Sequence, residues 1–216
     1  MTVNHTKRGF MRVSKILIVM IVSILTATVV AAQDRSLSPR GQASAQVGGS
    51  FNSEGRYSGG DWIDVNYGRP LLRGRDNMFG SGDSYGEGFL LGAPIWRVGA
   101  DQSTRFKTET DLMFGSQRLP AGEYSMFAEL AENEWTLVFS TWGVKQGFRE
   151  ENPDALWGAY DYTPDRDVLR TTMRVTTHPV SAEQLIITFT DMTLEGGSLT
   201  VWWDDQIATT PFSRAQ

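Results

Sequence analysis

The main pattern in this sequence after residue 60 is an alternation of apolar and polar side chains with a period of two residues. It is clearest in residues 62–67, where Ile63, Val65 and Tyr67 alternate with polar neighbours. Such alternation places successive side chains on opposite faces of a strand, and the chain carries about eight segments of this kind. They lie at residues 62–67, 104–114, 124–128, 135–140, 168–177, 185–191, 199–204 and 207–210.

Segments rich in glycine, proline and asparagine separate these predicted strands. A connection of hairpin length joins residues 124–128 to residues 135–140, so we expect these two strands to pair antiparallel. Residues 195–198 have the composition of another hairpin turn. Two longer stretches, residues 80–94 and 143–164, contain many chain-breaking residues and predict long loops, the second with room for a short helical turn.

The many short strands and the lack of a long amphipathic helix predict an all-β fold. An antiparallel β-sandwich is favoured, and a partly open β-barrel is the alternative. We expect a single β domain at residues 61–216, preceded by a flexible entry segment at residues 33–60 that adds at most one edge strand. Within the domain, Trp62, Trp135 and Trp203 are expected to fill the core.

The first 32 residues have the pattern of a targeting sequence. Four basic residues precede a 15-residue apolar run at residues 16–30, and small side chains follow up to Ala32. Because about 20 apolar residues are needed to span a bilayer, a cleaved signal peptide over residues 1–32 is favoured over an uncleaved anchor. We therefore expect a periplasmic or secreted protein without a membrane span. The pattern leaves open whether Met1 or Met11 is the true start.

The amino-acid composition excludes several kinds of functional site in the domain. The chain has no cysteine, which excludes disulfides, thiolate nucleophiles and thiolate metal sites. Removing residues 1–32 takes away four basic and no acidic side chains, which leaves 16 basic against 25 acidic residues and a net charge of −9. Such a charge disfavours nucleic acid as a partner.

The histidine content limits the common enzyme mechanisms as well. His178 is the one histidine beyond the predicted signal peptide, and no His-Glu-x-x-His string occurs. We therefore expect no metal and no cofactor. Glycoside hydrolysis needs only two suitably placed carboxylates, so it stays open. The acids to consider for it are Asp101, Glu123, Asp161 and Asp204.

Arginines and aromatic residues gather on both sides of the glycine-rich loop and form the candidate ligand-binding group. Its members are Tyr67, Arg69, Arg73, Arg75, Trp96, Arg97 and Asp101. Arginine binds carboxylates and phosphates through paired hydrogen bonds, and aromatic faces stack on sugars, so a small anionic or carbohydrate ligand is predicted. The alternative is structural, because arginines beside glycine and proline often bond backbone carbonyls, and large aromatics fill core ends.

Several strings, in matching order, resemble the domain of unknown function 2911 family. They are Arg69-Pro70 with Gly74-Arg75, Trp96-Arg97-Val98-Gly99-Ala100, and Pro120-Ala121-Gly122 with Tyr124. The resemblance covers essentially the whole chain after the predicted signal peptide. It implies an exported bacterial protein with a compact β domain and no settled activity. Asp101-Gln102 stands where members usually carry Asn-Glu; if that glutamate is catalytic, this chain lacks it.

Three functions follow as hypotheses, and the sequence does not decide whether the protein is an enzyme. The favoured one is a non-catalytic ligand-binding or interaction domain of the periplasm or cell envelope, with a recognition surface built from residues 80–94 and 143–164. The second is a carboxylate-dependent hydrolase acting on envelope sugars. The third is a structural domain that binds an envelope protein through an exposed strand edge.

Overall fold

A computed structural model describes Met1 and residues 36–215 of the chain. The predicted signal peptide therefore lies outside the described residues, apart from Met1. No helix in the described part of the chain is long and apolar enough to cross a membrane.

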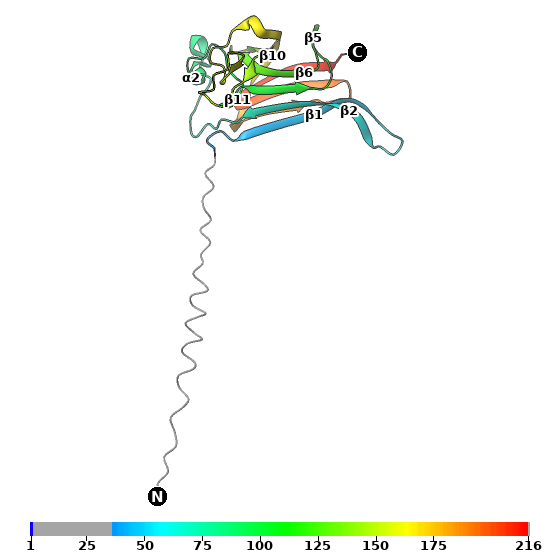
Figure 1. Cartoon of the computed structure of the whole chain (residues 1–216), viewed down its shortest axis with the longest axis horizontal. Helices are drawn as coiled ribbons and strands as arrows, with labels where there is room; N and C mark the ends of the chain where they lie inside the picture. The colour runs from blue at the N-terminus through cyan, green and yellow to red at the C-terminus, as the bar shows by residue number, and fades with distance from the viewer. Residues whose placement is uncertain (2–35, 216) are drawn as a thin grey trace. The chain divides into compact units, whose positions relative to one another are not determined.

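One nine-stranded antiparallel sheet dominates the domain, in the order β1-β2-β3-β6-β7-β10-β11-β4-β5 (Figure 1). Its strands are β1 (Arg40–Phe51), β2 (Tyr57–Gly68), β3 (Thr104–Thr108), β4 (Leu112–Phe114), β5 (Gln117–Leu119), β6 (Gly122–Glu129), β7 (Glu134–Ser140), β10 (Asp167–Thr190) and β11 (Gly196–Arg214). The short strands β8 (Gly143–Val144) and β9 (Ala155–Leu156) form a separate parallel pair. The sheet is not closed into a barrel, which confirms the predicted all-β, sandwich-like class.

The two long loops contain more regular structure than predicted. The first includes the 3-10 turn η1 (Gly82–Ser84) and the short helix α2 (Glu87–Leu90), and the second includes β8 and β9. A further 3-10 turn, η2 (Pro164–Arg166), begins where the second loop was expected to end.

The entry segment predicted to be flexible forms the edge of the sheet. Strand β1 pairs with β2 from Arg40 opposite Gly68 to Phe51 opposite Tyr57. The predicted domain boundary at residue 61 therefore falls inside β2, and order begins earlier than expected. The sequence does not predict β1 because Val47 is the only large apolar side chain that this strand buries. Backbone pairing with β2 needs no large side chains, so the strand forms without an alternating apolar pattern.

Strand β10 is one long element where two separate strands were predicted. Its first half pairs with β7 from Asp167 to Arg174, and register shifts on either side of Ala182 let it continue alongside β11. From Ile186 to Thr190 it pairs only with β11. The other edge of this second half is therefore left facing β1.

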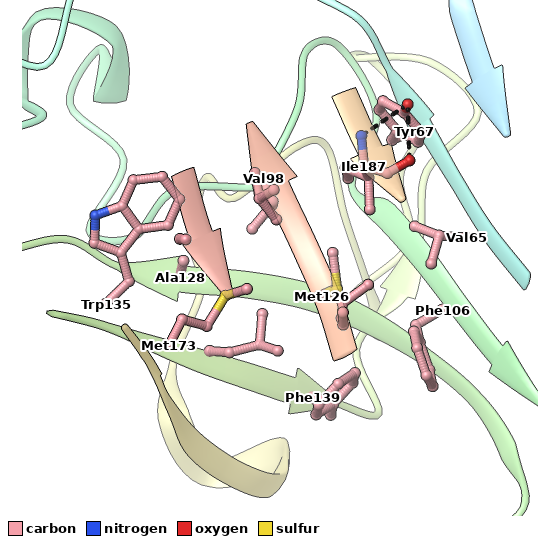
Figure 2. Close-up of a cluster of buried hydrophobic side chains, with 14 of the residues drawn as sticks. Val65, Tyr67, Val98, Phe106, Met126, Ala128, Trp135, Phe139, Met173 and Ile187 are labelled. Carbon is pink, nitrogen blue, oxygen red and sulfur yellow. Dashed lines mark hydrogen bonds between the residues drawn. The ribbon is translucent and has the colours of Figure 1, made fainter. Parts of the chain in front are cut away.

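The core is rich in aromatic side chains. Trp135 and Trp203 are buried as predicted, and Figure 2 shows Trp135 at one end of a buried cluster whose other labelled residues include members of β2, β3, β6 and β10. Trp62 is not in the core, because 45% of its surface is exposed. The alternation that turns Ile63 inward necessarily turns its neighbour Trp62 outward. Burial also raises the pKa of Tyr85 to about 12, and its hydroxyl accepts a hydrogen bond from Trp135 Nε1 at 3.2 Å.

Candidate ligand-binding cleft

Among the described residues, part of strand β1 before Gly48 has no backbone partner on the side away from β2. The N–H of Glu109, just beyond β3, donates to the carbonyl of Trp62 at 2.9 Å, so the backbone groups of Trp62 point toward β3. Backbone direction alternates along an antiparallel strand, and Asp64 therefore points the same way. Their partners in β1 are Gln46 and Ser44. The backbone groups of these two residues consequently face away from β2.

The second half of β10 presents a matching edge toward β1. The N–H of Leu185 donates to the carbonyl of Pro70 at 3.0 Å. The N–H of Ile187 donates to the Tyr67 hydroxyl at 3.0 Å, and that hydroxyl donates to the Ile187 carbonyl at 3.4 Å (Figure 2). These bonds show that odd-numbered residues of this half of β10 turn their backbone groups away from β11.

A cleft of about 370 Å³ lies between the two edges. Backbone hydrogen bonds tie the surrounding segments together at its two ends, from Leu185 to Pro70 and from Gly48 to Leu194. The lining residues come from β1, the end of β2, β10 and the turn after it. They are Gln42, Ala43, Ser44, Ala45, Tyr67, Arg69, Leu185, Ile186, Ile187, Thr188, Phe189 and Met192.

Small side chains on β1 create the space. Its inward positions beside the cleft carry Gly41, Ala43 and Ala45, while its even-numbered neighbours are more exposed. A Cβ added at Gly41 would lie 2.6 Å from Cδ of Arg69 and 2.9 Å from Cζ of Tyr67. Both side chains can therefore cross the inner face of β1 only because position 41 is glycine.

Tyr67 forms the back wall of the cleft. The side chain is 4% exposed, and its hydroxyl bonds both backbone groups of Ile187. The hydroxyl thus makes the hydrogen bonds to Ile187 that the backbone of a neighbouring strand would otherwise make. It is committed to the fold and leaves little capacity for a ligand.

Arg69 is the charged member of the lining and is half-buried. Its backbone N–H donates to the Pro39 carbonyl at 2.9 Å. Its side-chain Nε is buried without a hydrogen-bond partner, and no salt bridge between described residues includes Arg69. Because Arg69 is only half-buried, the exposed part of its side chain can meet an anion or an ordered water at the cleft.

Arg73 and Arg75 lie outside the cleft and bond backbone carbonyls. The Arg73 guanidinium donates to the carbonyl of Leu37, and its backbone N–H donates to the Glu183 carboxylate at 2.8 Å. Arg75 donates from Nε to the carbonyl of Leu72 at 2.9 Å. These contacts match the structural alternative that the sequence left open.

Trp96 is also buried and does not face a ligand-binding surface. It is 3% exposed, and its backbone pairs with Ala128 in both directions, at 2.8 and 3.0 Å. Its ring stacks on Trp203 and meets Trp135 edge to face, with centroids 6.3 and 5.5 Å away. Trp96 therefore belongs to the core.

Arg97 and Asp101 come together in a loop that does not line the cleft. Arg97 Nη1 donates to the Asp101 carbonyl at 3.3 Å, and its guanidinium lies 5.9 Å from the ring centre of Tyr160. Asp101 and Val98 have positive φ angles of 62° and 46°. A positive φ is unusual for a β-branched residue, so this loop is held in a strained form. The Thr104 hydroxyl helps to hold it by donating to the Val98 carbonyl at 2.9 Å.

The two loops expected to form a recognition surface mainly cover the core. In the first loop, Tyr85 and Phe89 pack against the main hydrophobic cluster. In the second, Leu156, Ala159 and Tyr162 belong to a smaller buried cluster. Neither loop contributes to the cleft lining.

The acids considered for glycoside hydrolysis do not meet at the cleft. Glu123 pairs with Arg105 at 3.0 Å, and Asp204 accepts hydrogen bonds from the Met78 N–H and the Ser181 hydroxyl. The cleft lining, as the described residues define it, includes no aspartate, glutamate or histidine. The described part of the chain also contains no group of three or more such side chains placed to hold a metal.

Two of the residues that line the cleft, Tyr67 and Arg69, were predicted from the sequence, and the other lining residues were not. The residues missed include Ala43 and Ala45 on β1, and Ile187 on β10. Tyr67 and Ile187 are 120 positions apart in the chain. No local pattern indicates such a contact, although the run of small residues on β1 is visible in the sequence.

The fold and the cleft together define the class of this protein. It is an antiparallel all-β domain with a cleft, large enough for a small ligand, between two strand edges. The chain belongs to the DUF2911 family of proteins of unknown function, whose model matches residues 52–212. The resemblance predicted from the sequence strings is thereby confirmed. No curated protein and no solved structure matches the chain.

Proposed function

We propose that this protein is an exported, non-catalytic binding domain that holds a small ligand in the cleft between β1 and β10. One observation carries the proposal: Arg69 lines a cleft of about 370 Å³ and takes part in no salt bridge between described residues. The volume falls within the range of about 300–1,000 Å³ typical of ligand pockets. A cationic donor without a partner in such a place favours a ligand with negative charge.

The composition of the lining supports binding over catalysis. General acids and bases are most often histidine, aspartate or glutamate. The described lining has none of these side chains, and the Tyr67 hydroxyl is occupied by Ile187. A carboxylate-dependent hydrolase at this cleft would lack both of its acids.

Filling the cleft is expected to abolish ligand binding while the domain stays folded. Ala43 is a small inward-facing residue of the lining, so Ala43→Leu places three extra carbon atoms in the space. The measurement is thermal unfolding of the full chain with a panel of small acids, sugars and divalent cations. A ligand at a hundredfold excess over Kd stabilises the wild type by about 2.7 kcal/mol. We expect Ala43→Leu to lose this shift.

A leucine on the same strand but outside the cleft serves as the control. Ser50 is exposed near the end of β1, so Ser50→Leu adds a similar side chain without entering the space. It should keep the ligand-induced shift of the wild type. If Ala43→Leu also keeps it, the ligand binds elsewhere, and if no compound in the panel shifts the wild type, a protein partner becomes the better explanation.

Export is the second part of the proposal and rests on the charge and hydropathy pattern of residues 1–32. When the full chain is expressed in a Gram-negative bacterium, we expect the protein in the periplasmic fraction. Intact-mass analysis should give a chain that begins at Gln33, whichever methionine starts translation. A full-length chain retained in the membrane fraction would instead identify an uncleaved anchor.

A further inference from the structure

We infer that the ligand of the cleft is a short peptide in an extended conformation, held by backbone hydrogen bonds along the β1 side of the cleft. This inference rests on the proposed function, because it names the ligand class of the same cleft. It goes further in assigning a backbone mode of recognition, a length and a pattern of side chains to that ligand.

Strand β1 offers a row of backbone groups along the cleft. The backbone groups of Ser44 and Gln46 face away from β2, and those of Gln42, which pairs with Asn66, face the same way because direction alternates along the strand. Within the described part of the chain, the N–H and C=O groups of these three residues have no backbone partner. An unpaired strand edge of this kind binds a ligand that supplies both donors and acceptors.

The opposite wall of the cleft adds fewer such groups. Odd-numbered residues in the second half of β10 turn their backbone groups away from β11, but the Tyr67 hydroxyl already bonds both groups of Ile187. Phe189 is the next odd-numbered residue, and its N–H and C=O have no backbone partner on the cleft side among the described residues. A peptide in the cleft therefore bonds mainly to β1 and meets β10 near Phe189.

The polarity of the cleft favours recognition of a backbone. The surface of the cleft is more polar than apolar, although seven of its twelve lining residues have apolar side chains. The polar side chains of β1 are occupied, since the Ser44 hydroxyl donates to the Asp64 carboxylate at 2.5 Å and Gln42 Nε2 donates to the Ser44 hydroxyl at 3.2 Å. Backbone groups remain, and a peptide repeats N–H and C=O groups at the spacing of a strand.

The closed ends of the cleft limit the length of the peptide. The N–H of Gly48 donates to the Leu194 carbonyl at one end, and the N–H of Leu185 donates to the Pro70 carbonyl at the other. The unpaired stretch of β1 between these ends covers residues 42–46. At about 3.4 Å per residue, it extends over about 14 Å. A peptide of about five residues fits this stretch, whereas the closed ends block the longer edge strand of a second copy.

The small side chains of β1 leave space for alternate side chains of the peptide. A peptide residue opposite Ser44 would place its side chain on the outer face of the sheet. Its two neighbours would place theirs on the inner face, beside Ala43 and Ala45. Because a cleft of about 370 Å³ must also hold the peptide backbone, we expect small or β-branched side chains at these inner positions.

The test is calorimetric titration of the protein with capped five-residue peptides. The library combines alanine, serine, threonine, valine and glutamate, and the tightest binder is then resynthesised with one N-methyl group at each position in turn. At positions that face β1, N-methylation should weaken binding about tenfold or more, because it removes a donor and leaves a carbonyl of β1 without its partner. Positions that face away should lose less. The losses should therefore alternate with a period of two residues.

Ser44→Pro removes one of the proposed donors from β1. Proline is tolerated on an edge strand where the missing N–H does not bond the neighbouring strand, as at this position. We expect the variant to bind the tightest peptide about tenfold more weakly. Ser53→Pro is the matched control. Ser53 follows Asn52 in a turn closed by the bond of 3.0 Å from the Gly55 N–H to the Asn52 carbonyl, a position that proline favours, so this variant should bind like the wild type.

The failures of this inference and of the proposed function are distinguishable. Binding that shows no period of two, or that a folded Ser44→Pro variant leaves unchanged, would overturn the pairing with β1. If no peptide binds, but a small acid, sugar or cation shifts the wild type and not Ala43→Leu, the peptide is excluded and the proposed function stands. Failure of both the library and the ligand panel would remove the proposed function as well. The N-methyl series uses only the wild-type protein, so it decides the inference even if Ser44→Pro does not fold.

Discussion

Trp96→Ala is expected to lower the free energy of unfolding by about 3–5 kcal/mol, the usual cost of truncating a large buried aromatic side chain. That is a large part of the total stability of about 5–15 kcal/mol of a typical domain. Trp96 is 3% exposed and packs against Phe79, Phe89 and Trp203, so its removal leaves a cavity that rigid neighbours cannot fill. Urea unfolding followed by circular dichroism measures the change.

Trp62→Ala is the matched control for this prediction. The same side chain is removed, but Trp62 lies on the outer face of β2 with 45% of its surface exposed. We expect a loss of less than about 1.5 kcal/mol, because less apolar area returns to water. Similar losses for the two variants would contradict the assignment of Trp96 to the core and of Trp62 to the surface.

Gly68→Ala is the second substitution expected to have a large effect. An added Cβ would lie 2.2 Å from the backbone oxygen of Ala100 and 2.9 Å from its carbonyl carbon. Backbone atoms cannot move aside as a side chain does, so the loop around Ala100 must shift. The hydrogen bond of 3.2 Å from the Ala100 N–H to the Gly68 carbonyl would weaken as well. We expect about 2–4 kcal/mol of destabilisation from overpacking and the lost bond.

Gly147→Ala tests whether this effect comes from the close approach. No atom lies within 4 Å of a Cβ added at Gly147, and this glycine is not among those with positive φ. The midpoint of urea unfolding should therefore stay near that of the wild type, or rise slightly because alanine restricts the unfolded chain. Should Gly68→Ala prove equally mild, the contact between Gly68 and Ala100 would be looser than the structure indicates.

The strained loop beside Gly68 contains Asp101 and Gln102, the two positions at which the sequence resemblance implied a different pair of residues. Asp101 has a φ of 62°, a conformation that aspartate adopts more readily than most residues. Gln102 donates from Nε2 to the Gln146 side chain at 3.1 Å. In this chain, the two positions therefore fix the loop against the segment after β8, and neither lines the cleft.

Local sequence patterns determined several of the strands and their buried faces, although not β1. The alternation of Ile63, Val65 and Tyr67 predicted a half-buried strand, and all three side chains are buried in β2. The short loop between β6 and β7 predicted their antiparallel pairing. These predictions succeed because a period of two and a short connection act over a few residues, within which sequence and structure are directly linked.

Tertiary structure alone decided which arginines face a cleft. Arg69 and Arg73 are four positions apart and chemically identical, yet one lines the space beside β10 and the other bonds a backbone carbonyl. The difference arises because β10 leaves β7 and brings Ile187 against Tyr67, 120 residues away. Periodicity specifies which face of a strand is buried. Which distant edge that strand meets depends on how the whole sheet folds over its core, and no local pattern carries that information.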